Sequence, residues 1–271
     1  FKLSAMPFYF FLIFLESVAS EVMYVAGLAY AYRRGDISLV YPLVRAMPVL
    51  MVAAVTIFLG LGKTPSGVAL FGMLVITLGC ILMPLKHFSD FKLSNYLSWI
   101  IIFIILGAIG TTGYTILDSS AMAMIRRITE RNSVLDLLAY LFMIEAGLTV
   151  GQMFFVVSIK QEREEFKRLF LRSIYPVLAG ICSSGAYGLI LFAMGYVTNV
   201  SYIQAFRQMS LPLGFFAGIL ILKESHSTPK VFGITYCSGT GDGCFGINRN
   251  KKSRISDTGE SGFFILPYQN Y

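Results

Sequence analysis

Charged residues are scarce in this sequence, and their scarcity excludes a soluble globular protein. Only 14% of the 271 residues are charged, 56% are hydrophobic, and the mean hydropathy is +0.69. Soluble domains carry about 25% charged residues, so this chain lacks the polar surface that contact with water requires. The composition therefore predicts a chain that is surrounded by lipid.

Histidine and cysteine are too few or too scattered for the commonest metal and disulfide sites. The two histidines, His87 and His226, form no H-E-x-x-H pair, so a metal hydrolase is not expected. The four cysteines follow no disulfide or metal-binding spacing. The spelling G-x-G-x-x-G at 241–246 has no strand before it and no βαβ unit around it, so no dinucleotide site and no cofactor are expected.

Basic residues outnumber acidic ones, but their distribution does not indicate a nucleic-acid partner. The net charge is +7, and the basic residues lie mainly in short connections between apolar segments and in a polar C-terminal tail. No recognition motif or sustained basic helix accompanies them, so they are interpreted as topology and lipid-headgroup charges. No basic region precedes a short apolar core after Phe1, so no signal peptide is expected, and the N-terminus is interpreted as truncated.

Seven apolar segments are long enough to cross a bilayer, for which a helix needs about 20 residues. The segments are 7–32, 38–62, 64–85, 95–117, 137–159, 174–196 and 200–222. The stretch 173–206 has no formal charge but is too long for one span, and the break is placed at Val197-Thr198-Asn199. We therefore expect an all-α integral membrane protein, a polytopic helical bundle.

Three further segments are more polar than these spans. Residues 231–247 occupy the position of an eighth span, but Ser238–Gly243 is polar and glycine-rich. The tail, 248–271, resembles neither a span nor a packed domain and is expected to be disordered. The mixed charges of 160–172 cannot be immersed in hydrocarbon, so this segment is expected to be a helical extension in water or at the bilayer interface.

Two stretches of the chain match when it is laid on itself at an offset of about 162 residues. Residues 41–48 then fall on residues 202–210, and Arg45 falls on Arg207. Repeats of this size in a helical membrane protein indicate a transporter that is built from two related halves, with a pathway between them.

Two segments carry a family resemblance. They are AYRRGDISLVYPLVR at 31–45 and Leu222-Lys223-Glu224, which a helix with Gly233 follows. These segments resemble the two halves of an EamA-type transporter of the drug/metabolite transporter (DMT) superfamily. The resemblance implies ten helices in two five-helix repeats of inverted topology, and export or exchange of small metabolites.

On this template the chain divides into two unequal repeats. The resemblance implies three helices of the first repeat in 1–86, the five helices of the second in 95–247, and a polar tail in 248–271, with two N-terminal helices missing. It also implies a multi-pass location in the cell membrane. The basic residues Arg126, Arg127 and Arg131 would then form a cytoplasmic loop after the span 95–117.

Ionisable groups inside apolar spans are the main candidate site residues, because each costs a few kcal/mol or more in hydrocarbon unless it has a partner or a wet cavity. Arg45 and Arg207 each lie about two turns into their helices. Together with Tyr41 and Tyr202, they are expected to contact an anionic or zwitterionic solute. The alternative is that each arginine bonds a helix end or snorkels to the interface. Glu21 is expected to pair with an arginine or to take a proton.

Two further carboxylates complete the candidate set. Asp118 follows Tyr114 by one turn near the expected end of a span, so a position at headgroup level stays open beside a role in translocation. Glu145 lies in the middle of its span and has no counterpart in the other half. The full set of substrate-binding or translocation candidates is Glu21, Tyr41, Arg45, Tyr114, Asp118, Glu145, Tyr202 and Arg207.

Glycines within the spans are expected to allow close helix approach, which packing explains without a substrate. They are Gly107, Gly110, Gly113, Gly180, Gly185 and Gly188.

The functional hypothesis is a secondary transporter that exports a small metabolite or drug-like solute by alternating access, and not an enzyme. Two alternatives stay open. A non-transporting, truncated relict is suggested by the missing helices and the unusual C-terminus, and a membrane-embedded transferase would need a His, Asp or Ser cluster near one interface. The expected partners are the lipid bilayer and a small-molecule solute; coupling to protons and a homodimer are left open.

Overall fold

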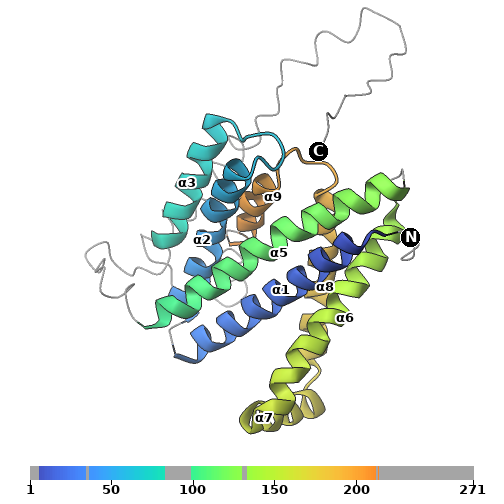
Figure 1. Cartoon of the computed structure of the whole chain (residues 1–271). Coiled ribbons are helices and arrows are strands. Elements are labelled where there is room, and N and C mark those ends of the chain that lie inside the picture. The colour runs from blue at the N-terminus through green and yellow to red at the C-terminus, as the bar shows by residue number, and fades with distance from the viewer. Residues whose placement is uncertain (1–5, 35–36, 83–98, 130–132, 212, 214–271) are drawn as a thin grey trace, which may run out of the picture.

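The computed structural model describes residues 6–34, 37–82, 99–129, 133–211 and 213 (Figure 1). Within these ranges the secondary structure is helical and includes no strand, so the expected all-α class is confirmed there. The helices are α1 (Phe8–Arg34), α2 (Ile37–Phe58), α3 (Gly67–Leu82), α5 (Ile100–Thr129), α6 (Val134–Ser158), α7 (Lys160–Arg172), α8 (Tyr175–Ala193) and α9 (Ser201–Phe206), followed by the 3-10 turn η3 (Arg207–Met209).

Among the described residues, five helices are long and apolar enough to cross a membrane: α1, α2, α5, α6 and α8. The apolar helix α3 has 16 residues, which is shorter than an ordinary span. Phe142 and Phe154 on α6 are 74% and 70% exposed, as is typical of side chains that face lipid. The chain is therefore a helical, membrane-embedded protein. The expected span 231–247 and the tail lie outside the described residues.

Helix α5 is longer than the sequence indicated. We expected a span that ended at Leu117 and a basic loop beyond it, but the helix continues to Thr129 and places Arg126 and Arg127 in its last turn. The expectation of a loop at these two arginines was wrong. The charge of Asp118 does not end the helix, because side chains from three other helices satisfy its carboxylate inside the bundle.

The antiparallel pair α1 and α5 forms the centre of the fold (Figure 1). Glycine allows the two backbones to approach closely. A Cβ added at Gly27 would lie 2.8 Å from the backbone nitrogen of Gly107, and one added at Gly110 would lie 2.6 Å from the carbonyl oxygen of Ser20. At Gly113 it would lie 2.6 Å from Ser20 Oγ. Real Cβ atoms do not approach backbone atoms this closely, so Gly27 and Gly110 are required for the observed spacing. At Gly113 the near atom is the end of a serine side chain, which can turn away.

The expected role of glycine in helix packing is thus confirmed at Gly110 and Gly113 on α5. It is not found at Gly180 and Gly185 on α8, where an added Cβ would meet no described atom within 4 Å. Gly188 is intermediate, because its added Cβ would lie 3.2 Å from Leu141 Cδ2.

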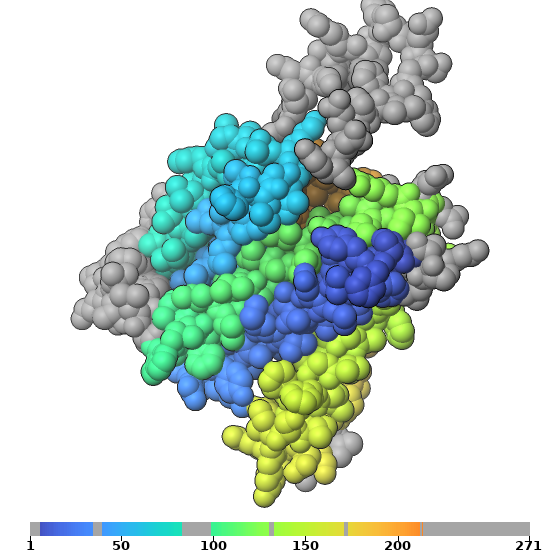
Figure 2. Space-filling view, in the orientation of Figure 1, coloured from blue at the N-terminus to red at the C-terminus, as the bar shows by residue number. Residues whose placement is uncertain are grey.

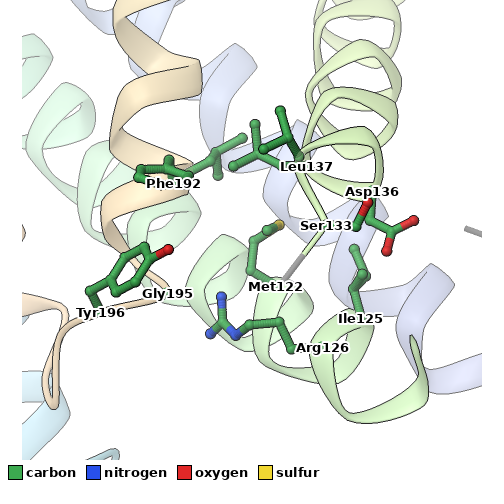
Figure 3. Close-up of a pocket in the computed structure, with 11 residues that line it drawn as sticks. Met122, Ile125, Arg126, Ser133, Asp136, Leu137, Phe192, Gly195 and Tyr196 are labelled. Atoms are coloured by element: carbon green, nitrogen blue, oxygen red, sulfur yellow. The ribbon is translucent and has the colours of Figure 1, made fainter. Parts of the chain in front are cut away.

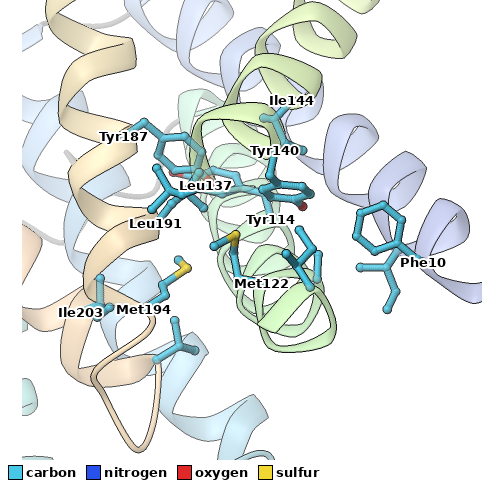
Figure 4. Packing of buried hydrophobic residues seen from close by; sticks show 14 of the residues in the cluster. Phe10, Tyr114, Met122, Leu137, Tyr140, Ile144, Tyr187, Leu191, Met194 and Ile203 are labelled. Carbon is cyan, nitrogen blue, oxygen red and sulfur yellow. The ribbon is translucent and has the colours of Figure 1, made fainter. Parts of the chain in front are cut away.

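The remaining helices flank the central pair on two sides. Helices α2, α3 and α9 lie on one side, and α6, α7 and α8 on the other (Figures 1 and 2). A buried apolar cluster joins α6 and α8 of the second group to α1, α5 and α9 (Figure 4). Because α1 belongs to 1–86 and α5 to 95–247, the two repeats that the sequence suggests share one core. The expected boundary at 86–95 lies outside the described residues.

Candidate functional site

Asp118 is the centre of a buried polar cluster. Its side chain is fully buried on α5, about three turns before the end of the helix. Oδ1 accepts hydrogen bonds from Ser17 on α1 and from Tyr140 Oη on α6, the latter at 2.7 Å. Oδ2 accepts one from Tyr187 Oη on α8. Asp118 therefore joins four helices inside the bundle through hydroxyl donors.

Arg207 enters the same region from η3. Its Nη2 donates to Tyr114 Oη at 3.0 Å, and Nη1 donates to Gln204 Oε1 at 3.2 Å. The guanidinium also lies over the Tyr114 ring, 5.7 Å from its centroid, where a cation is attracted to the aromatic face. Tyr114 in turn packs edge-on against Tyr187, with ring centroids 5.8 Å apart. Arg207 is therefore connected to the Asp118 cluster through two tyrosines.

Glu21 lies one turn after Ser17 on the face of α1 that meets α5 and α6. It interacts electrostatically with Asp118, Glu145 and Arg207, so the structure brings four of the candidate ionisable residues together. Glu21 Oε2 is buried and has no hydrogen-bond partner among the residues that the structure describes. This oxygen is an acceptor that a proton, a water molecule or a cationic group of a solute could satisfy.

Arg45 lies on α2, beside the segment that carries Arg207. Its Nη2 donates to Tyr41 Oη at 3.0 Å, and its guanidinium lies 5.2 Å from the centroid of that ring. Gln208 Nε2 donates to the carbonyl oxygen of Arg45 at 3.1 Å, which joins η3 to α2. Tyr24 on α1 interacts electrostatically with both arginines. The two arginines thus lie in neighbouring elements on one side of the central pair, and each contacts a tyrosine hydroxyl and ring.

Tyr202 does not hold Arg207 in the way that Tyr41 holds Arg45. Its hydroxyl accepts a hydrogen bond from the backbone N–H of Ser66 at 3.4 Å. Tyr202 and Arg207 nevertheless line the same open, largely apolar pocket of about 280 Å³ between α8 and α9. The other lining residues are Leu189, Ile190, Ala193, Val197, Ile203 and Phe206.

Several residues of the cluster were not identified from the sequence. They are Ser17, Tyr140, Tyr187, Gln204 and Gln208. Each is a polar residue inside an apolar segment, and Ser17, Glu21 and Tyr24 follow one another at helical spacing. A search for polar side chains of any charge at i, i+3 or i+4 from the ionisable ones would have found Ser17 and Gln204.

The arrangement can bind and orient charged groups of both signs. The described residues contain no group of three or more His, Cys, Asp or Glu side chains that could hold a metal ion. They do place two guanidinium groups, three carboxylates and several tyrosines around the middle of α1. Such a set suits a solute with carboxylate or ammonium groups, because each sign of charge finds a partner of the other sign.

Comparison with models of protein families finds no match for this sequence. A search of curated proteins likewise finds no matching relative.

Proposed function

We propose that this chain is a secondary transporter of a small metabolite or drug-like solute, located in the cell membrane and similar to EamA-type members of the DMT superfamily. In this proposal it has seven spans or more in two inverted repeats, works as an exporter and is not an enzyme. The two arginines that the sequence repeat relates, Arg45 and Arg207, contact the solute, while Glu21 and Asp118 carry the opposite charge.

The observation that carries the proposal is the concentration of ionisable side chains inside membrane-spanning helices. An ionisable residue in hydrocarbon is costly, and such residues in membrane proteins usually mark a substrate or ion pathway. Glu21, Asp118 and Arg207 come from α1, α5 and η3 and lie within reach of one another's charge. Packing alone does not require them, since apolar side chains could fill the same space.

The local geometry of the two arginines supports the idea of related halves. Each donates a hydrogen bond of 3.0 Å to a tyrosine hydroxyl and lies over the same tyrosine ring. For Arg45 that tyrosine is one turn earlier on its own helix, whereas for Arg207 it comes from α5. The two sites are therefore similar in chemistry and different in construction, as is typical of repeats that have diverged.

Alternating access would be a movement of one helix group against the central pair. Glycine-mediated contact makes α1 and α5 a close-packed unit, and Gln208 ties η3 to α2. The group of α2, α3 and α9 would then rock as a body and expose Arg45 and Arg207 to one side of the membrane and then the other.

Direct measurement of flux tests the proposal. The full-length protein is first screened in detergent for solutes that raise its melting temperature, using libraries of amino acids, nucleosides and organic acids. Solutes that give a shift are then loaded into proteoliposomes, with and without an imposed pH gradient, and their exit is measured against liposomes without protein. We expect saturable efflux of at least one solute that also stabilises the protein.

A matched variant separates transport from leakage. Arg207→Gln should lower the saturable component about tenfold to hundredfold, while Arg168→Gln on α7, where Arg168 pairs with Glu165 on an exposed surface, should leave it unchanged. If no stabilising solute is carried by the wild-type protein, the chain is a non-transporting relict and the proposal is wrong.

A further inference from the structure

A polar pocket at the end of α5 lies apart from the Asp118 cluster. It is open on one side, has a volume of about 220 Å³ and is lined by α2, α5 and the segments 61–62 and 194–200. On α5 the lining positions Ile116, Ser119, Ala123 and Arg126 follow helical spacing and form one face. Asp118 points to another face, and Arg126 lies about two turns, or roughly 12 Å, further along the helix.

Arg126 supplies the only charge among the residues that line this pocket. The side chain is half-buried and extends from α5 toward Gly195 and Tyr196 (Figure 3). Although Asp136 lines a smaller adjoining pocket, its carboxylate points away from the guanidinium (Figure 3). Arg126 makes no hydrogen bond or ion pair with any residue that the structure describes. None of its five N–H donors is therefore taken by a described residue.

Hydroxyl groups line the same pocket beside the guanidinium. The hydroxyls of Ser119 and Thr198 have no hydrogen-bond partner among the described residues, so both can donate. The volume of about 220 Å³ holds a phosphate-sized group with several water molecules, since each water takes about 30 Å³. No carboxylate lines the pocket, so an anion there would meet no carboxylate among the lining residues.

The wall of the pocket opposite α5 is fixed before any ligand arrives. Asn199 Nδ2 donates to the carbonyl oxygens of Leu61 and Lys63, both at 3.1 Å, and the N–H of Lys63 donates to the carbonyl oxygen of Thr198 at 3.1 Å. Gly62 adopts φ +76, and a Cβ there would lie 2.4 Å from the Thr198 oxygen. These contacts hold Thr198 in place across from Ser119, so binding would order little additional chain.

We propose that this pocket is an oxyanion-binding site for a phosphate group, in which Arg126 is the anchoring cation and Ser119 and Thr198 donate hydroxyl hydrogen bonds. A planar guanidinium matches two oxygens of such a group at once. The phosphate belongs either to a lipid headgroup, because the pocket lies at the end of a membrane-spanning helix, or to a soluble solute. The site does not depend on the proposed transport activity.

Inorganic phosphate is the probe for the first experiment. Binding of radiolabelled phosphate to the full-length protein in detergent is measured by equilibrium dialysis for the wild type, Arg126→Gln and the control Arg163→Gln on the exposed surface of α7. We expect Arg126→Gln to weaken binding by about tenfold or more, as the loss of a charge-assisted bond implies, and Arg163→Gln to leave it unchanged. Equal binding by all three proteins overturns the proposal.

A second measurement keeps the test valid if Arg126→Gln does not fold. Phenylglyoxal modifies accessible arginines, and mass spectrometry follows Arg126 and Arg163 separately in the wild-type protein. Phosphate should slow modification of Arg126 but not of Arg163. The single variant Ser119→Ala should reduce this protection severalfold. Modification of Arg126 at the same rate with and without phosphate overturns the proposal.

Two membrane conditions identify the source of the phosphate group. In delipidated detergent solution either source predicts protection of Arg126 by inorganic phosphate. The same measurement is then made in nanodiscs of phosphatidylcholine, whose headgroups carry phosphate. If inorganic phosphate no longer protects Arg126 there, lipid headgroups occupy the site; if it still protects Arg126, the site takes a soluble ligand. Absence of solute transport by the wild-type protein, with phosphate binding retained, would count against the proposed function and not against this site.

Discussion

Arg207 donates a hydrogen bond to the hydroxyl oxygen of Tyr114 at 3.0 Å, although the two residues are 93 positions apart in the sequence. The contact joins η3 to the middle of α5. Tyr114 also packs against Tyr24 of α1 and Tyr187 of α8, with ring centroids 5.8 Å away in both cases. Contacts of Tyr114 therefore link α5 with α1, α8 and η3, and they fix where the guanidinium of Arg207 lies.

Two substitutions separate the charge of Arg207 from the geometry of its guanidinium. Arg207→Gln should lower saturable efflux about tenfold to hundredfold, because a charge-assisted hydrogen bond is worth about 1.5–3 kcal/mol. Arg207→Lys keeps the charge but loses the planar fork, so it should retain part of the flux. Proteoliposome efflux with equal amounts of inserted protein makes the comparison.

Tyr114→Phe is the matched control for the Arg207 variants. It removes the hydroxyl that accepts from Arg207 but leaves the ring in place. We expect a loss of flux smaller than that of Arg207→Gln. If Arg207→Gln transports as well as the wild type, the residue has only a structural role.

The helices could be predicted from the sequence, because an uninterrupted apolar run of span length leaves a chain few alternatives. The ends of α1, α6 and α8 lie within a few residues of the expected ones. The end of α5 could not be predicted in this way. From composition alone, the charge of Asp118 predicts the end of a span. In the structure Asp118 is buried because hydroxyl groups of three other helices donate hydrogen bonds to its carboxylate.

The site itself depended on contacts that no local pattern contains. Ser17, Tyr140 and Tyr187 reach Asp118 from positions 101, 22 and 69 residues away. The ionisable members of the site stand out in an apolar sequence, and Glu21 and Arg207 were found for that reason. Tyrosines are common in membrane helices, so residue type alone does not distinguish Tyr140 and Tyr187 from the other tyrosines of the chain.

Removing the acceptor at Asp118 should destabilise the protein more than removing any one of its donors. Asp118→Leu leaves three hydroxyl groups without their acceptor in the bundle, at about 1–3 kcal/mol for each unsatisfied group. Tyr140→Phe removes one hydroxyl and leaves the other two bonds in place. We expect a much larger fall in melting temperature in detergent for Asp118→Leu.

Asp118→Asn distinguishes a structural role from a role in transport. The amide keeps one acceptor oxygen and a similar shape, so the melting temperature should fall less than for Asp118→Leu. If the charge of Asp118 serves transport, efflux is lost in a variant that still folds. If Asp118→Asn carries the solute at the wild-type rate, the residue has only a structural role.

Close packing of α1 on α5 predicts a difference between two glycine-to-alanine substitutions. At Gly110 the added methyl group would lie 2.6 Å from two backbone atoms of α1, so the helices must separate and the protein should lose about 1–3 kcal/mol of stability. At Gly180 an added methyl group meets no described atom within 4 Å. Because alanine is also the better helix former, Gly180→Ala should be neutral or slightly stabilising.

Thermal unfolding of the two variants in the same detergent measures the difference. The melting temperature of Gly110→Ala should fall clearly below that of the wild type, while that of Gly180→Ala should not. Equal melting temperatures would show that α1 and α5 do not approach as closely as their glycines allow.

Helix α7 is expected to lie at the bilayer interface. The extended residues Ile159 and Ser173 separate it from α6 and α8, so it does not continue the axis of either span. Phe166 and Phe170 stack with ring centroids 5.0 Å apart, and with Leu169 they form an exposed apolar stripe at i, i+3 and i+4. Burial of this stripe among lipid chains accounts for apolar side chains on an otherwise charged helix.

Tryptophan fluorescence can measure the depth of each face of α7. The chain has one tryptophan, Trp99, and its replacement by phenylalanine gives a background in which Phe170→Trp or Glu164→Trp is the only reporter. Lipids brominated near the top of the acyl chain should quench the reporter at 170 strongly and the one at 164, on the opposite face, weakly. Aqueous acrylamide should show the reverse order, since only the charged face is in water. Equally weak quenching by the brominated lipids at both positions would place the whole helix in water and contradict the interfacial position.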